Sequence, residues 1–339
     1  MTVLSVLDQS PIRTGGSAAD AVRETLELAR LADRLGYRRY WVAEHHSSDG
    51  LAGTVPEILV ARIAAETDTI RVGSGGVMLS HYPPLKVAET FRMLETLYPG
   101  RIDLGIGRPP GSDRRTAEAL AYVRGAIGPE YFARQVQDLI GWMSGELEAD
   151  HPFRDVVAQP RGPSNPELWL LGSSDQSAQL AAHFGTAFSF AHFIAEGGEP
   201  VMEMYRRRFQ PSPPCPEPRG SIGVFAIVAD TEEEAKRHAA SRDLWRLRLE
   251  RGEIGPIPSP EEALAYEYSE AERARVAVHR RRNIVGPPDR AKERLDELLT
   301  RYGVDEAVVV TITYDFAARK RSYELLARVY GLSGSVGPA

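Results

Sequence analysis

The feature that most constrains the fold is a repeated alternation of short apolar runs with longer segments of helical periodicity. Eight runs rich in Val, Ile and Leu each precede such a segment, and they cover residues 4–10, 38–46, 69–79, 101–107, 167–174, 187–193, 221–230 and 306–315. Runs that are apolar on both faces are typical of a parallel sheet covered by helices. Eight strand–helix units favour an α/β fold of the closed (β/α)8 TIM barrel type, with an open doubly wound sheet as the alternative.

One segment interrupts the alternation. Residues 251–288 are rich in glycine, proline and acidic residues and precede the last predicted strand. A long insertion at this place in a barrel is more often a lid or binding loop than a separate domain, with a surface excursion without function as the alternative. We therefore expect one barrel domain over residues 1–339, with a lid insertion at residues 251–288.

Composition excludes several classes of protein. The chain has 339 residues, of which 42% are hydrophobic and 26% charged, enough for a large core. A net charge of −6 and the lack of a long basic stripe argue against a nucleic-acid partner. No apolar run reaches the ~20 residues that cross a bilayer. Cys215 is the only cysteine, so we expect no internal disulfide and a cytoplasmic location.

The carboxyl ends of the predicted strands hold the candidates for chemistry, because catalytic groups of (β/α)8 barrels gather at that face. Polar residues and glycines occupy most of these positions. They are Asp8, Gln9, Ser10, Glu44, His45, His46, Gly73, Ser74, Gly75, Gly76, Gly107, Arg108, Gly172, Ser173, Ser174 and His192.

Two adjacent histidines follow the second predicted strand. Alternation along a strand would send His45 and His46 to opposite faces, so the pair alone would not supply two ligands to one metal ion. No HxH or HExxH spacing is present, which disfavours a metal hydrolase. We expect one histidine to be hydrogen-bonded in the barrel wall. The other would serve as an acid, a base or a hydrogen-bond partner in a pocket near neutral pH.

The turn after the fifth predicted strand has the chemistry of an anion site. Ser173 and Ser174 lie at the strand end and Ser177 at the start of the next helix, where free N–H groups and hydroxyls bind anions. An ordinary helix cap is the alternative. Arg108, at the end of strand four, can reach this turn and bind a phosphate in a fork geometry. Together these residues predict a phosphorylated ligand.

The glycines of the third predicted strand suggest a flat ligand close to the backbone. Gly75 and Gly76 have no side chain to obstruct it, although a kinked strand is the alternative. With the anion turn and a histidine, they fit flavin mononucleotide, and a sugar phosphate would also satisfy the pattern. The GIGRPPG segment is not a dinucleotide fingerprint, because its spacing is GxGxxxG and Pro109 and Pro110 oppose the helix that a pyrophosphate site requires.

Over nearly its whole length the sequence resembles the bacterial luciferase-like superfamily of flavin-dependent monooxygenases. The matching stretches are LSVLDQSP, YWVAEHH, RVGSGGVML, PLKVAETFRMLETLYPGRIDLGIGR and GSSDQSAQLAAHFG. The resemblance implies a (β/α)8 barrel, usually a homodimer, that binds reduced FMN at its mouth. It also implies reaction with O2 through a flavin C4a-hydroperoxide, oxidation of a small organic substrate, and a separate flavin reductase, since no nicotinamide site is recognisable.

The family's functional residues map onto this sequence by position. His45 matches the catalytic histidine beside the flavin, and residues 251–288 fall where the luciferase catalytic subunit has its mobile lid. Gly75 and Gly76 match a non-prolyl cis peptide under the flavin ring. Ser173 departs from the acidic residue that luciferase carries at this position. The residues that match phosphate-binding positions are Arg108, Ser174 and Ser177.

Two other functions stay open. A deazaflavin F420-dependent hydride-transfer oxidoreductase of the same superfamily would share the barrel and the phosphate pocket, although the AEHH stretch favours the oxygenases. A catalytically silent flavin-binding protein is the second. We expect a homodimer through the second and third helices. The substrate is not specified by the sequence, and we expect an apolar cavity near Leu7, Trp41, Phe190 and Phe193.

Overall fold

A closed barrel of parallel strands forms the centre of the molecule in the computed structural model, which describes residues 2–108, 113–120 and 129–334. The barrel strands are β1 (Val3–Asp8), β2 (Arg39–Val42), β3 (Arg71–Met78), β4 (Ile102–Gly107), β5 (Glu167–Gly172), β6 (Ala187–Ala191), β7 (Gly220–Val228) and β9 (Glu306–Val310). The barrel closes because β9 pairs with both β1 and β7. The predicted eight-stranded barrel is therefore confirmed. Pro109 and Pro110, which argued against a dinucleotide site, lie outside the described residues.

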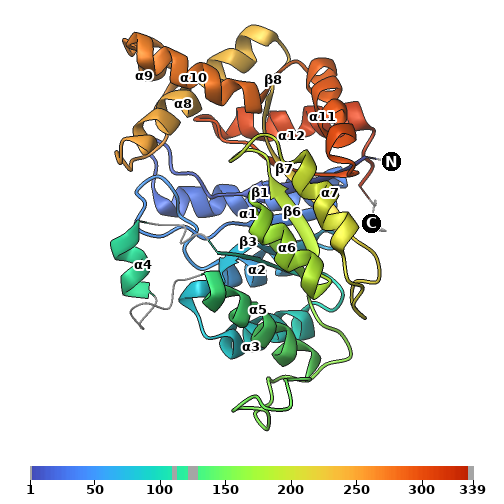
Figure 1. Cartoon of the computed structure of the whole chain (residues 1–339). Helices are drawn as coiled ribbons and strands as arrows, with labels where there is room; N and C mark the ends of the chain where they lie inside the picture. The colour runs from blue at the N-terminus through green and yellow to red at the C-terminus, as the bar shows by residue number, and fades with distance from the viewer. Residues whose placement is uncertain (1, 109–112, 121–128, 335–339) are drawn as a thin grey trace.

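Helices cover the outside of the barrel (Figure 1). They are α1 (Ala18–Leu35), α2 (Pro56–Ala65), α3 (Pro84–Leu97), α4 (Arg114–Leu120), α5 (Pro129–Ser144), α6 (Asp175–Phe184), α7 (Glu199–Arg208), α8 (Glu232–Glu250), α11 (Pro288–Tyr302) and α12 (Phe316–Tyr330), with a short 3-10 turn at Leu79–His81. α1 is capped at both ends, because Ser17 and Asp20 form a capping box at its start and Gly36 ends it with φ 84°. Within the described ranges every helix is too short or too polar to span a bilayer.

The core has two apolar layers. The larger one lies between the strands and the outer helices, where residues such as Val6, Leu28 and Tyr323 are buried. The second fills the inside of the barrel, where the Trp41 and Trp169 rings meet edge to face with centroids 5.3 Å apart. Strand residues therefore contact apolar groups on both faces, which is why the strands have no polar alternation.

The insertion contains an element that the sequence did not predict. It folds into α9 (Pro260–Ala265), α10 (Glu270–Arg282) and a ninth strand, β8 (Ile284–Gly286), which pairs with the carboxyl end of β7. α9 and α10 lie beside α8 at the top of Figure 1. Ile257 donates its N–H to Ile12 O at 2.8 Å and accepts from Thr14 N at 2.9 Å. The start of the insertion is thereby attached to the loop that follows β1.

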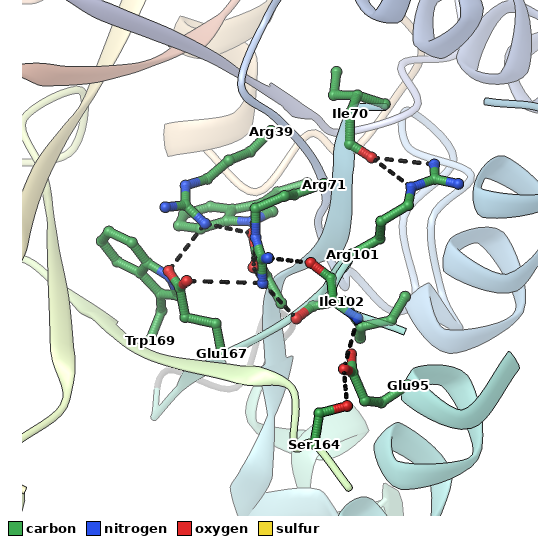
Figure 2. A network of polar contacts seen from close by, with 12 residues as sticks. Arg39, Ile70, Arg71, Glu95, Arg101, Ile102, Ser164, Glu167 and Trp169 are labelled. Carbon is green, nitrogen blue, oxygen red and sulfur yellow. Dashed lines mark hydrogen bonds and ion pairs between the residues drawn. The ribbon is translucent and has the colours of Figure 1, made fainter. Parts of the chain in front are cut away.

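The amino-terminal end of the barrel is filled by a network of charged side chains (Figure 2). The Arg39 guanidinium contacts Glu306 at 2.8 Å and Glu167 at 3.0 Å, and lies 4.7 Å from the Trp169 ring centroid. Asp103, which is fully buried, accepts from Arg39 at 2.9 Å. It also accepts from Arg71 Nε at 2.7 Å and from Trp41 Nε1 at 2.9 Å.

Because Asp103 satisfies three buried donors, we expect Asp103→Asn to lower the free energy of unfolding by about 3–5 kcal/mol, the usual cost of breaking a buried ion pair. Urea denaturation at neutral pH measures it. The matched control is Glu297→Gln, which removes an exposed ion pair with Arg294 and should cost less than about 1 kcal/mol. A similar small loss for Asp103→Asn would contradict the role assigned to this carboxylate.

Candidate functional site

A cavity of about 390 Å³ lies at the carboxyl end of the barrel, among the residues that follow the strands. Gln9 follows β1, His45 and His46 follow β2, and Val310 and Ile312 lie at the end of β9. α8 supplies the opposite wall with Arg242, Trp245, Arg246 and Leu249. A larger recess of about 730 Å³ lies at the other end of the barrel beside Trp169 and Glu306, away from the strand-end candidates. We therefore place the candidate site at the carboxyl end.

His45 lines this cavity. Its backbone N–H donates to Gly53 O at 2.7 Å, which fixes the loop after β2. Its side chain is partly buried, and Nδ1 has no hydrogen-bond partner among the described residues. Burial, with a smaller contribution from His46, lowers the pKa of His45 to about 4. The imidazole is therefore neutral at pH 7 and can donate or accept one further hydrogen bond.

His46 is held by a buried carboxylate. Its Nε2 lies 2.7 Å from Glu44 Oε1, and Glu44 also accepts from the N–H of Met78 and the hydroxyl of Tyr82, each at 2.9 Å. One histidine is thus fixed in the wall, as predicted. The predicted opposite orientation of the pair is wrong, because both histidines line the same cavity. β2 ends at Val42, so the alternation of a strand does not extend to them.

The residues of the predicted anion turn lie together. β5 ends at Gly172 and α6 begins at Asp175, with Ser174 as its N-cap. The Ser174 side chain caps no helix N–H and lies 3.3 Å from the Ser177 hydroxyl. Arg108 Nη1 donates to Gln176 Oε1 at 2.8 Å, which places its guanidinium beside the first turn of α6. Ser173, partly buried, lies between Gly172 and this N-cap. The helix N-terminus, two hydroxyls and a guanidinium therefore meet at one place, as an anion site requires.

The peptide bond between Gly75 and Gly76 is cis, as the resemblance implies. A Cβ on Gly75 would lie 2.5 Å from Leu7 Cδ1, and a Cβ on Gly76 would lie 2.6 Å from Gly105 O. The space that the missing side chains leave is thus occupied by the barrel itself. Close packing of neighbouring strands therefore requires glycine at both positions. That a flat ligand lies against them stays a prediction.

The apolar wall of the cavity differs from the predicted one. Of the four residues expected there, only Phe193 lines it, whereas Trp41 and Phe190 are buried in the core. The sequence did not indicate the residues of α8. This helix is buried at every position from Ala239 to Trp245, because it lies between the barrel and the insertion. It therefore shows no amphipathic period from which an inward face could be read.

Metal-binding geometry is not found in the described ranges, where no three His, Cys, Asp or Glu side chains converge on one point. His192, one of the predicted candidates at the strand ends, has its Nδ1 2.8 Å from the Tyr302 hydroxyl. Burial lowers the pKa of His192. This histidine packs among α7 and α11 rather than in the cavity.

Comparison with known proteins identifies the family. Residues 2–306 match the family described as luciferase-like monooxygenase. The N-acetyl-S-alkylcysteine monooxygenase of Bacillus subtilis (strain 168) is 37% identical over 329 residues, covering 96% of this chain and 98% of that protein. The crystal structure of apo-MsnO8 superimposes with a TM-score of 0.88 at 40% identity, covering 98% of this chain and 99% of that chain.

A third comparison concerns the fold alone. The oxygenating constituent of 3,6-diketocamphane monooxygenase from Pseudomonas putida, solved in complex with FMN, has a TM-score of 0.71 at 20% identity. The two chains cover 97% of each other. The match to the family description and the similarity to the Bacillus enzyme both extend over most of the sequence. This chain therefore belongs to the luciferase-like monooxygenase family.

Proposed function

We propose that the protein is an FMN-dependent monooxygenase that oxidises a small organic substrate in the cavity beside His45. The observation that carries the proposal is a neutral histidine, with no partner for Nδ1 among the described residues, at the same barrel mouth as the anion turn. The name of the Bacillus relative and the FMN complex of the camphane enzyme support this class of reaction.

The residues of the mouth fit a flavin phosphate. Arg108 would pair with phosphate oxygens, and the hydroxyls of Ser174 and Ser177, with the N–H groups that begin α6, would donate to them. Gly75 and Gly76 would form the barrel wall beneath the ring. Bound reduced FMN would supply the electrons for the reduction of O2, and a separate flavin reductase in the cytoplasm would provide it.

His45 would act on the oxygen atom that is transferred. Its neutral ring can donate a hydrogen bond to that oxygen or take up a proton there, because no residue of the described ranges is hydrogen-bonded to Nδ1. Phe193, Phe225 and Ile254 line the same cavity and would limit the access of water. We propose that residues 251–288 serve as the lid, since Ile254 already lies at the cavity and Ile257 is attached to the loop after β1.

We also propose a homodimer formed through α2 and α3. These neighbouring helices expose large apolar side chains, with Ile58 of α2 68% exposed and Leu97 and Met93 of α3 58% and 49% exposed. Exposed apolar side chains on adjacent helices are the kind of surface that a protein interface buries.

Arg108→Ala should raise the dissociation constant of reduced FMN about tenfold or more, because a charge-assisted pair with the phosphate is lost. The affinity for reduced riboflavin, which has no phosphate, should not change. Anaerobic equilibrium dialysis of both flavins measures this, with Arg207→Ala on the exposed face of α7 as the control. Equal weakening of both flavins would contradict a phosphate site, and binding of F420 without FMN would favour the hydride-transfer class.

His45→Gln should make bound reduced FMN reoxidise faster with O2, while FMN binding is retained. When anaerobically reduced FMN bound to the wild-type protein meets O2, we expect the absorbance of oxidised FMN to return more slowly than for free FMN. The variant should shorten this delay about tenfold or more, since a positioned acid–base group is removed. Stopped-flow absorbance measures it, with the exposed His183→Gln as the matched control. An unchanged delay would refute the role of His45, and its absence in the wild type would favour a silent flavin-binding protein.

The double variant Ile58→Glu, Leu97→Glu should convert the dimer into a monomer, because each substitution buries a charge in the proposed interface. Sedimentation equilibrium would then give a mass near the 37.4 kDa of one chain, where the wild type gives about twice this value. Leu264→Glu changes a leucine of α9 that is equally exposed, at 60%, and should leave the dimer intact. A wild-type mass of one chain would contradict the proposal.

A further inference from the structure

Arg242 is a buried cation that no carboxylate of the described residues neutralises. Its side chain belongs to α8, is only 8% exposed and lines the cavity that holds His45. No hydrogen bond or ion pair joins its guanidinium to another residue in the described part of the chain, and Nη1 is both buried and unpartnered. Such a group destabilises the folded state unless something pairs with it.

The nearby carboxylates contact other cations. Asp243 accepts from Arg280 Nε at 2.7 Å. Glu250 accepts from Arg275 at 2.8 and 3.0 Å, and its Oε1 lies 2.9 Å from His279 Nε2.

Arg242 nevertheless remains charged. Burial lowers the pKa of Arg242 to about 10, with Asp243 opposing this shift and Arg246 and Arg282 adding to it. Its guanidinium therefore stays positive at pH 7, and within the described ranges no contact neutralises it.

The orientation of Arg242 leaves its N–H groups available. The guanidinium carbon lies 4.1 Å from the centroid of the Phe225 ring, a cation–π contact that supports the flat face of the group. This contact uses none of the five N–H donors, which radiate from the edge of the plane. A carboxylate has the geometry to accept two of them at once.

The rest of the cavity is suited to an apolar group. Trp245, Leu249, Phe193 and Ile254 line it together with Arg242. Among the lining residues that the structure describes, Asp113 is the one carboxylate, and it is exposed at the rim. A volume of about 390 Å³ is at the small end of ligand pockets. The cavity therefore combines one buried positive charge with an apolar surface.

We infer that the substrate is a small carboxylic acid with an apolar group, and that Arg242 binds its carboxylate in a bidentate pair. That the bound acid is the substrate of the reaction rests on the proposed monooxygenase function. That Arg242 binds a carboxylate rests on the cavity alone. Arg246 also lines the cavity but lies 3.5 Å from Glu250, so we assign the carboxylate to Arg242. The apolar group would then extend from Arg242 toward His45, which lines the same cavity.

The test uses acids paired with their neutral amides: 3-phenylpropanoate with 3-phenylpropanamide, octanoate with octanamide, and N-acetylleucinate with N-acetylleucinamide. Isothermal titration of the flavin-free protein gives the dissociation constants. We expect at least one acid to bind about tenfold or more tightly than its amide. Arg242→Met should abolish this preference and leave the affinity for the amide unchanged. Arg242→Lys should retain part of it, because a point charge replaces the fork.

Stability separates a ligand-binding role from a structural one. If Arg242 serves a ligand, Arg242→Met removes an unpaired buried charge and should leave the midpoint of thermal unfolding equal or higher. The matched control is Arg248→Met on the same helix, whose guanidinium lies 2.8 Å from Glu262 and does not line the cavity. It should leave the preference for acids unchanged.

Two results would overturn the inference. One is that no acid binds more tightly than its amide, and the other is that the preference persists in Arg242→Met. Because the titration uses no flavin, its outcome is independent of the proposed function. If the wild-type protein binds an acid but neither binds FMN nor slows its reaction with O2, the monooxygenase function is rejected and the carboxylate site is retained.

Discussion

The pairing of buried charges at the amino-terminal end of the barrel is the constraint on which the rest of the structure depends. Asp103 at the start of β4 accepts from Arg39 of β2 and Arg71 of β3, while Arg39 also contacts Glu306 of β9. These contacts fix the relative positions of four strands at one end. Because the strands are parallel, their carboxyl ends then lie together at the other end of the barrel, around one cavity. The position of His45 relative to the anion turn follows from this alignment.

Buried carboxylates are paired at both ends of the barrel. At the floor Asp103 has three donors, and at the carboxyl end of β1 Asp8 accepts from Arg319 at 2.6 Å and from the N–H of Ser10 at 2.7 Å. At the mouth, the ring nitrogen of His45 and the guanidinium of Arg242 have no such partner among the described residues. Polar groups that a folded protein buries without partners are costly, and they gather where a ligand can supply the missing contact.

Much of the fold was predictable because the local signals were strong. Apolar runs identified the barrel strands, and the Ser17 cap with Gly36 set both ends of α1. The strand β8 was missed because three residues inside an irregular insertion give no periodic signal. The directions of side chains beyond a strand end were also unpredictable. For this reason the opposite orientation predicted for the side chains of His45 and His46 was wrong.

Predictions about the site were uneven for a related reason. Proximity of Arg108 to the turn before α6 follows from barrel geometry, since β4 and β5 are adjacent. The cis bond at Gly75 rested on family resemblance rather than on the residues themselves. What fills the space beside a glycine depends on side chains distant in sequence, here Leu7. α8 lines the cavity because the insertion covers its other side. The sequence of α8 has no local pattern that reveals this.

α8 forms one wall of the cavity but contributes no strand to the barrel. Its inward side chains can therefore be exchanged during evolution without disturbing the floor that holds the strands or the turn that begins α6. Mutation of this one helix can alter which compounds an enzyme of this architecture accepts while its oxygen chemistry is inherited unchanged. New metabolic specificities can thus arise from the few α8 side chains that face the cavity, while the rest of the helix keeps its packing.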